Sequence, residues 1–240
     1  MPFTLSHPAV VLPLRRLGLP MTALVIGTMS LDLPLYLGSR RGYEITHHPA
    51  SIVTIDIALT LLVVAGWFTV LRDPLVDLAP APIRSRLEPH VRLTRRQWVL
   101  AIPAAVIAAA THIFWDSFTH ADQWGYNRVA WLREDHLGLS GLRWAQYGSA
   151  LIGLAIVIAY AVVELRSLPP DRPRAPRALS PYALLGAVGL AVVAGLVTVV
   201  AAIPDGLYAM AFNGVVISLI TLAVTVLAVC VAWHVFIRRH

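Results

Sequence analysis

Residues 98–120 read WVLAIPAAVIAAATHIFWDSFTH, and this stretch decides the class of protein. Residues 98–110 carry no ionisable side chain, and the apolar run as a whole is long enough to cross a bilayer as a helix. His112, Asp116 and His120 then follow at intervals of four residues. Ionisable side chains within a membrane span are costly and are therefore functional candidates. The stretch predicts a membrane-spanning helix that carries a polar site near its end.

The composition of the whole chain supports this interpretation. Of 240 residues, 58% are apolar and only 13% are Asp, Glu, Lys or Arg, whereas soluble proteins have about 25% charged residues. An ordinary soluble enzyme, a disordered chain and a fibrous repeat are excluded. The basic residues are scattered over several loops, which argues against a nucleic-acid partner. Cys230 is the single cysteine, so neither an internal disulfide nor a cysteine-based zinc site can form.

Five apolar runs are long enough to span a bilayer as helices, at about residues 51–71, 98–118, 146–165, 182–203 and 208–237. We therefore expect an all-α polytopic bundle, organised as a single membrane domain over residues 1–240, with the lipid bilayer as its partner. Residues 166–181 are rich in Pro and Arg and are expected to form a loop. Small residues are dense in the fourth run, which favours close helix packing.

The first 50 residues allow two interpretations. Residues 21–37 could form a sixth span by themselves. Alternatively, Ser6-His7-Pro8 resembles a helix start with Ser6 as its cap, and Gly18-Leu19-Pro20 marks a break before a second helix that ends near Asp32. The second interpretation predicts an antiparallel hairpin of two short helices over residues 1–50, followed by a transmembrane bundle over residues 51–240. Only the hairpin places His7 beside Asp32.

The arginine distribution predicts the orientation of the chain. Arginine is concentrated in the loops at 72–97 and 166–181 and at the C-terminus. Because basic loops remain in the cytoplasm, we expect a multi-pass protein of the bacterial cytoplasmic (inner) membrane with a cytoplasmic C-terminus. Asp56, His112 and Asp116 then lie at the opposite, extracytoplasmic end, where Trp115, Trp144 and other aromatic residues form an interfacial belt.

The polar residues at this end suggest a metal site. A spacing of four residues puts His112, Asp116 and His120 on one helix face. Histidine and aspartate ligands with an open position are typical of zinc in hydrolytic enzymes. In the simpler alternative, His112 and Asp116 hydrogen-bond each other and satisfy a buried polar pair. Asp56 could be a ligand, a partner of a histidine N–H group, or a residue facing water.

Several motifs of this chain resemble a known family in the same order along the sequence. They are residues 2–13 (PFTLSHPAVVLP), 23–32 (ALVIGTMSLD), Thr46-His47, 111–120 (THIFWDSFTH) and 146–149 (QYGS). The chain resembles the bacterial membrane proteins grouped as domain of unknown function 4184. Its pattern is also similar to that of membrane-bound metal-dependent hydrolases, and this likeness implies five candidate ligands: His7, Asp32, His47, His112 and Asp116. Members of that wider group often have an acid–histidine pair after the early aspartate, whereas Leu33-Pro34 follows Asp32 here, which argues against a two-metal site.

The resulting functional hypothesis is a metal-dependent hydrolase at the extracytoplasmic membrane face. The five ligands would hold one or two divalent ions such as Zn²⁺, and Asp56 or His120 would accept a proton or orient a ligand. The position at the membrane boundary suggests an ester or phosphoester of a lipid-like or lipid-linked substrate. Two alternatives are a non-catalytic protein with a structural metal site or polar network, and a small transporter. The apolar middle of every span argues against the transporter.

Overall fold

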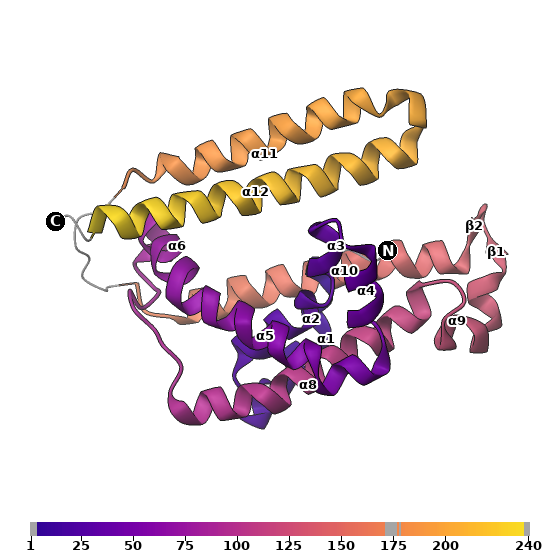
Figure 1. Cartoon of the computed structure of the whole chain (residues 1–240), viewed down its shortest axis with the longest axis horizontal. Helices are drawn as coiled ribbons and strands as arrows, with labels where there is room; N and C mark the ends of the chain where they lie inside the picture. Colours follow the sequence, from indigo (N-terminus) through magenta and orange to yellow (C-terminus); the bar gives the residue numbers. More distant parts are fainter. Residues whose placement is uncertain (1–3, 171–176, 178, 238–240) are drawn as a thin grey trace. The chain divides into compact units, whose positions relative to one another are not determined.

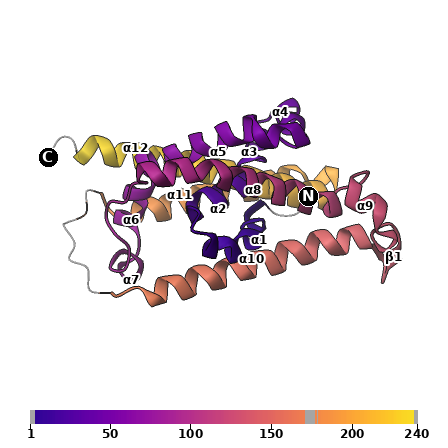
Figure 2. The same ribbon diagram turned by 90° about the horizontal axis from the view of Figure 1, so that it is seen from below.

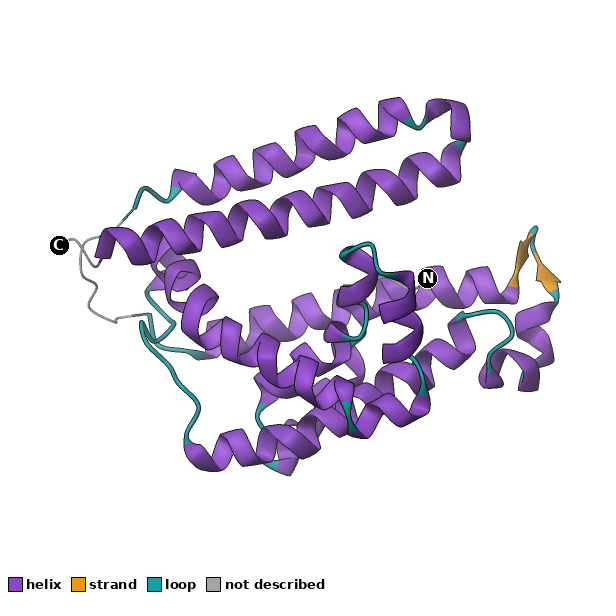
Figure 3. Ribbon diagram, viewed as in Figure 1, coloured by secondary structure: helices purple, strands orange, loops and turns teal. Residues whose placement is uncertain are grey.

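The computed structural model describes residues 4–170, 177 and 179–237, and these residues are almost entirely helical (Figure 3). Asp135–His136 (β1) and Leu139–Ser140 (β2) form a short antiparallel pair, in which Asp135 lies opposite Ser140. The predicted all-α class is confirmed. Residues 171–176 and 178 of the expected 166–181 loop lie outside the described residues, as does His240.

Within the part of the chain that the structure describes, five helical segments are long and apolar enough to cross a membrane: Ile55–Leu78, Arg95–Thr119, Gly141–Ser167, Tyr182–Ala201 and Ala209–Phe236. They correspond to the five predicted runs. The first begins later than expected because Pro49–Val53 forms a separate 3-10 turn, and it continues through Arg72 and Asp73. In each segment, only 6–33% of the most apolar window is buried within the structure, which suits helices that face lipid.

The chain divides into two compact units, formed by residues 1–65 with 93–164 and by residues 66–92 with 165–240. The first unit contains, in chain order, η1 (Thr4–Ser6), α1 (Pro8–Val11), η2 (Leu12–Leu17), α2 (Met21–Ser30), α3 (Leu33–Tyr36), α4 (Arg40–Thr46), η3 (Pro49–Val53), most of α5 (Ile55–Gly66), α8 (Arg95–Thr119), α9 (Trp124–Arg128), η5 (Ala130–Arg133), the strand pair and most of α10 (Gly141–Ser167). The second unit contains the π-helical turn η4 (Trp67–Leu71), α6 (Arg72–Leu78), α7 (Ala81–Arg84), α11 (Tyr182–Ala201), η6 (Ile203–Asp205) and α12 (Leu207–Ile237).

The core of the first unit is the packing of α2 on α8. One face of α8 consists of alanines that are completely buried, at positions 101, 104, 105, 108 and 109. Opposite them, a Cβ atom on Gly27 of α2 would lie only 2.7 Å from the Cβ of Ala108. The small residues therefore let the two backbones approach closely. The same face of α8 continues into His112 and Asp116, so this packing brings α2 and the polar end of α8 together.

The N-terminal segment folds back on itself within this unit. Gly18 takes a left-handed conformation (φ 70°) and ends η2, and α1 packs against α2. His7, rather than Ser6, occupies the N-cap position of α1. At ten residues, α2 is about 15 Å long, half the thickness of a bilayer core. The segment lies between α8 and α10 (Figures 1 and 2), and Ser6 approaches Gly153 of α10 so closely that a Cβ on Gly153 would clash with it.

In the second unit, α11 and α12 run side by side as an antiparallel hairpin (Figure 1). Gly195 allows close contact with Ser218, as the small-residue pattern predicts, whereas Gly186 and Gly189 face open space. The π-helical turn interrupts the regular α-helical hydrogen-bonding pattern between α5 and α6. His234 Nε2 lies 3.0 Å from the carbonyl oxygen of Val70 in this turn, and this contact gives the His234 ring a structural role.

Candidate metal centre

The first unit brings five histidine and aspartate side chains from four segments to one point. His7 precedes α1, Asp32 lies between α2 and α3, His47 follows α4, and His112 and Asp116 lie on the last turns of α8. Two groups have ligand atoms that all lie within 4.8 Å of one another: His7 with Asp32 and His112, and His47 with His112 and Asp116. These are the five residues that the sequence comparison implied as ligands.

The three imidazoles of this cluster share one hydrogen-bonding arrangement. Each Nδ1 lies near a backbone carbonyl oxygen, at 3.3 Å for His7 and Thr4, 2.9 Å for His47 and Tyr43, and 2.7 Å for His112 and Thr28. A carbonyl oxygen can only accept, so each Nδ1 must carry the proton and donate it. In the neutral rings, every Nε2 is then an unprotonated acceptor that points into the cluster. This is the arrangement by which proteins orient histidine ligands of metals.

The Nε2 atoms converge on one another and on carboxylate oxygens. Nε2 of His47 lies 3.1 Å from Nε2 of His112. Nε2 of His112 lies 3.4 Å from Asp116 Oδ2, and Nε2 of His7 lies 3.1 Å from Asp116 Oδ1. Two neutral acceptors at 3.1 Å repel each other unless a cation lies between them or one of the two rings is protonated. For comparison, two nitrogen ligands of one tetrahedral zinc ion lie about 3.3 Å apart, given bonds of about 2.0–2.1 Å.

Asp32 adds a second carboxylate to the cluster. The Thr4 hydroxyl donates a hydrogen bond of 2.6 Å to Asp32 Oδ2, which fixes the carboxyl group. Oδ1 lies 3.4 Å from His47 Nε2 and 3.6 Å from His112 Nε2. Burial raises the pKa of Asp32. When the imidazoles are protonated, the hydrogen bond from His47, the charge of His112 and the Thr4 hydroxyl outweigh burial and hold this pKa below its ordinary value. The Asp32 carboxylate thus faces the Nε2 atoms of two histidines.

Asp56 and His120, the expected proton acceptors, lie at the edge of this arrangement. His120 directs Nδ1 toward Asp116, at 3.2 Å from its backbone oxygen and 3.5 Å from Oδ2. Burial lowers the pKa of His120 and the charge of Asp116 opposes that shift. Asp56 is fully buried, and its Oδ2 accepts a 2.7 Å hydrogen bond from the Ser51 hydroxyl. Within the described chain, His120 Nε2 and Asp56 Oδ1 are buried without a hydrogen-bond partner.

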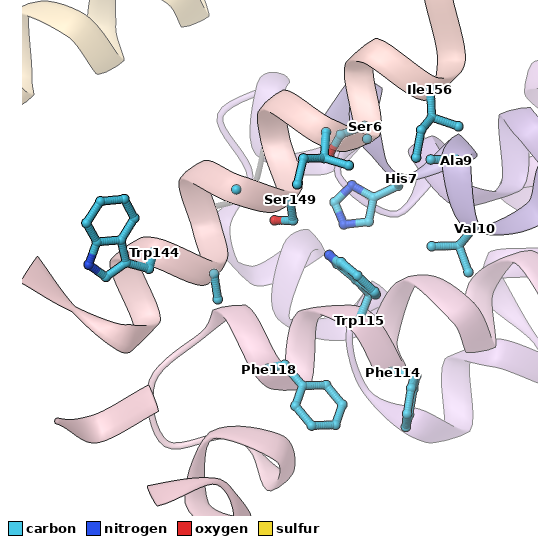
Figure 4. A pocket seen from close by; sticks show the side chains of 14 residues that line it. Ser6, His7, Ala9, Val10, Phe114, Trp115, Phe118, Trp144, Ser149 and Ile156 are labelled. Atoms are coloured by element: carbon cyan, nitrogen blue, oxygen red, sulfur yellow. The ribbon is translucent and has the colours of Figure 1, made fainter. Parts of the chain in front are cut away.

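The cluster is shielded from solvent on most sides. His112 is 1% exposed and Asp32 is 2% exposed, whereas the side chain of His47 keeps 14% of its surface. On the other side, His7 lines a cavity of about 660 Å³ between α1, α8 and α10 (Figure 4). The cluster thus borders solvent beside His47 and borders the cavity at His7, which is itself 3% exposed.

Several groups that complete the site were not identified from the sequence. Thr4 and the three backbone carbonyl groups are such partners. Tyr43 is another: its ring lies 3.8 Å from the His47 ring, centre to centre, and burial together with the charges of Asp116 and Asp32 raises its pKa. The spacing from Tyr43 to His47 is one helical turn, so a contact could have been inferred. Backbone carbonyl groups leave no signal in a sequence.

Comparison with known protein families identifies the family of this chain. A family model described as domain of unknown function 4184 (DUF4184) matches residues 1–233. The chain belongs to this family. The match includes every member of the His/Asp cluster, the whole first unit and most of the second. No curated protein and no solved structure matches the chain. With its five span-like helices, it is a membrane protein of the DUF4184 family, and the site must be interpreted from its own chemistry.

Proposed function

We propose that this DUF4184 protein is a metal-dependent hydrolase that cleaves an ester or phosphoester at the membrane surface. The observation that carries the proposal is the convergence of three Nε2 atoms, each on a ring whose Nδ1 faces a backbone carbonyl oxygen, with two carboxylates. Such a donor set fits a divalent cation, and mixed nitrogen and oxygen ligands favour zinc.

Each residue of the site has a proposed chemical role. His7, His47 and His112 would hold the ion with Asp32 and Asp116. A bound zinc ion would polarise a carbonyl or phosphoryl oxygen and lower the pKa of a water molecule. His120 and Asp56 are proposed to accept or relay a proton, because each has one buried atom without a hydrogen-bond partner in the described chain.

The location of the reaction follows from the arginine distribution. The basic loops at 72–97 and 166–181 are proposed to lie in the cytoplasm, so the cluster would face the extracytoplasmic side of a bacterial cytoplasmic membrane. A substrate would reach the cluster at the depth of the membrane boundary. This position supports a lipid-like or lipid-linked substrate.

A structural metal site is the second candidate, and one observation favours it. His112 and Asp32 are almost completely buried, as ligands of a closed site would be. The partial exposure of His47 and the cavity beside His7 favour an open, catalytic site instead. The two candidates share the metal and differ in whether a substrate reaches it.

Metal analysis tests what both candidates require. We expect close to one or two equivalents of zinc or manganese in detergent-purified protein prepared without chelators. His112→Ala and Asp116→Ala should lose the metal, whereas His136→Ala and Asp135→Ala, which change residues of β1 outside the cluster, should keep it. Thermal unfolding of each variant verifies that it is folded. A wild-type protein without stoichiometric metal would refute the hydrolase and the structural metal site alike.

Activity separates the two candidates. Metal-loaded protein should hydrolyse at least one member of a panel of phosphoesters and carboxyl esters, including lipids. The His112→Ala variant should not hydrolyse that substrate, and the His136→Ala variant should. Stoichiometric metal without activity on the whole panel would favour the structural site.

A further inference from the structure

The cavity beside His7 has an apolar wall that the hydrolytic centre does not require. It holds about 660 Å³, which is within the usual size of ligand pockets. Aromatic side chains of α8 form one wall, and residues of α10 such as Ile152 and Ile156 form another. Among the described residues that line it, there is no acidic side chain, arginine or lysine. Its polar side chains are few and comprise Ser6, His7, Trp115, Trp144 and Ser149.

The cavity and the His/Asp cluster meet at one side chain. Figure 4 shows the His7 ring in the space between Trp115 and Ser149. The Nε2 atom of the same ring lies 3.1 Å from Asp116 Oδ1. Trp115 and Asp116 are neighbours on α8, and Trp115 lines the cavity while Asp116 belongs to the cluster. A ligand seated in the cavity would therefore end beside the candidate metal ligands.

We infer that this cavity binds the acyl chain of the substrate, and that the substrate is an ester or phosphoester of a membrane lipid. The inference rests on the proposed hydrolase and specifies its substrate class. A charged headgroup would find no ion-pair partner in the cavity lining. An alkyl chain needs only apolar contacts, and it can enter laterally because both α8 and α10 are span-like helices.

The cavity would act by positioning the reacting bond. A chain that moves from the bilayer into an apolar cavity gains little from the hydrophobic effect, since both surroundings are apolar. Binding in the cavity would instead hold the chain, and the bond attached to it, at a fixed position relative to the His/Asp cluster. Holding a reacting bond at the catalytic groups is a large part of catalysis. Chain length should therefore control the rate of hydrolysis more than it controls partitioning into the membrane.

Gly148 offers a way to fill the cavity without disturbing the fold. It lines the cavity on α10, and a Cβ atom built there meets no heavy atom within 4 Å. Gly148→Leu would place its side chain in this open space. Gly186→Leu is the matched control, because Gly186 lies on α11, also has no atom within 4 Å and does not line the cavity.

Binding is measured first, with a phosphatidylcholine analogue that carries a photoreactive diazirine at the end of a palmitoyl chain. In full-length protein, we expect crosslinks to peptides of α8 and α10 that line the cavity. Gly148→Leu should reduce this crosslinking by at least about tenfold, the range for steric exclusion from an apolar pocket. Gly186→Leu should leave it unchanged. Equal crosslinking in Gly148→Leu and wild type would refute the chain-binding site, and this readout does not depend on metal or on activity.

Hydrolysis then tests whether the bound chain belongs to the substrate. On a series of esters from two to sixteen carbons, the rate should rise with chain length in wild type and Gly186→Leu. Gly148→Leu should lose the long-chain preference while it retains metal. If the lipid crosslinks but the rate of hydrolysis does not depend on chain length, the inference is overturned. The cavity would then bind a membrane lipid that is not the substrate. Absence of metal or of all hydrolysis would instead refute the proposed function.

Discussion

The Nε2 atoms of His47 and His112 lie 3.1 Å apart, although the two residues are 65 positions apart in the chain and come from different helical segments. Each ring directs Nδ1 toward a backbone carbonyl oxygen, so neither neutral ring can donate a proton to the other. The pair is unfavourable without a positive charge. A cation shared by the two rings removes the repulsion, and so would protonation of one ring. The two explanations predict different responses to chelation.

Removal of the metal should lower the thermal stability of the protein. If a cation relieves the repulsion in the cluster, its release leaves converging acceptors and two buried carboxylates. A ligand at 1,000 times its dissociation constant stabilises the folded state by about 4 kcal/mol. We expect a chelator to lower the melting temperature of the wild type and zinc to restore it, as measured by thermal unfolding in detergent. His112→Ala should be insensitive to both additions. A chelator-insensitive wild type would favour a protonated histidine pair.

Loss of the Thr4 hydroxyl should weaken metal binding while the fold remains intact. This hydroxyl donates the 2.6 Å hydrogen bond that orients Asp32 Oδ2. Partners of metal ligands typically contribute about 10–100-fold to affinity. Thr4→Val should therefore lower zinc affinity by about that factor in a competition titration with a chromogenic chelator. Thr198→Val is the matched control, since Thr198 bonds only the backbone of its own helix α11. Equal affinity in Thr4→Val and wild type would show that Asp32 is not a ligand.

Much of the fold follows from simple patterns in the sequence. The five apolar runs predict the five span-like helices, because helix length and composition are local properties. The apolar run predicts that the first span begins near residue 51, whereas α5 begins at Ile55. Pro49 and the residues after it form a 3-10 turn, and apolarity alone does not separate such a turn from a helix. The close approach of α2 to α8 depends on Gly27 facing Ala108, a pairing that a single sequence does not contain.

The candidate site was harder to predict than the fold. The spacing of His112 and Asp116 placed them on one helix face, which is again a local property. The hairpin interpretation placed His7 beside Asp32, and the family resemblance named both residues with His47 as ligands. The long-range contacts that bring these three residues to α8 are not contained in a single sequence. His120 shares the four-residue spacing with Asp116, but it uses Nδ1 for this contact and lies outside the converging groups. The ring atom that a histidine presents depends on its backbone partners.

Enlarging Gly27 should disrupt the site from a distance. A Cβ there would lie 2.7 Å from the Cβ of Ala108, and neither backbone can yield without separating α2 from α8. Overpacking of this kind costs about 1–3 kcal/mol. Gly27→Val should lower the melting temperature and also reduce metal content, because α2 leads to Asp32 and α8 carries His112. Gly186→Val, with open space around it, should change neither quantity. Retention of full metal occupancy in a folded Gly27→Val variant would contradict this coupling.

A buried aspartate in the second unit should matter for stability alone. Asp73 is 5% exposed and faces three basic groups: Arg92 at 2.8 Å, His90 at 3.0 Å and Arg72 at 3.2 Å. Removing one partner from a fully buried ion pair costs about 3–5 kcal/mol. Since Arg92 and His90 are largely exposed, we expect a loss nearer 2 kcal/mol in Asp73→Asn, measured by thermal unfolding. Metal content should stay at the wild-type level, and the exposed Asp205→Asn should change neither value.

The side of the membrane that the site faces can be tested with single cysteines. Cys230 is buried and is the only cysteine of the chain, so the wild type serves as a blank for a membrane-impermeant maleimide. Leu5 is 40% exposed and lies two residues from His7, while Leu137 is 96% exposed in the turn between β1 and β2. We expect Leu5→Cys and Leu137→Cys to react in intact spheroplasts. Ala81→Cys, in a basic loop proposed to be cytoplasmic, should react only after permeabilisation.

The result for Leu5→Cys bears directly on the cluster. His7 can contact Asp116 only if the N-terminal segment lies on the same side as the C-terminal end of α8, and Leu137 marks that side. Labelling of Leu5→Cys together with Ala81→Cys, and not with Leu137→Cys, would mean that residues 21–37 cross the membrane. His7 would then be separated from Asp116 by the bilayer and would be removed from the ligand set. Labelling together with Leu137→Cys would leave His7 at both the cluster and the cavity, as their geometry requires.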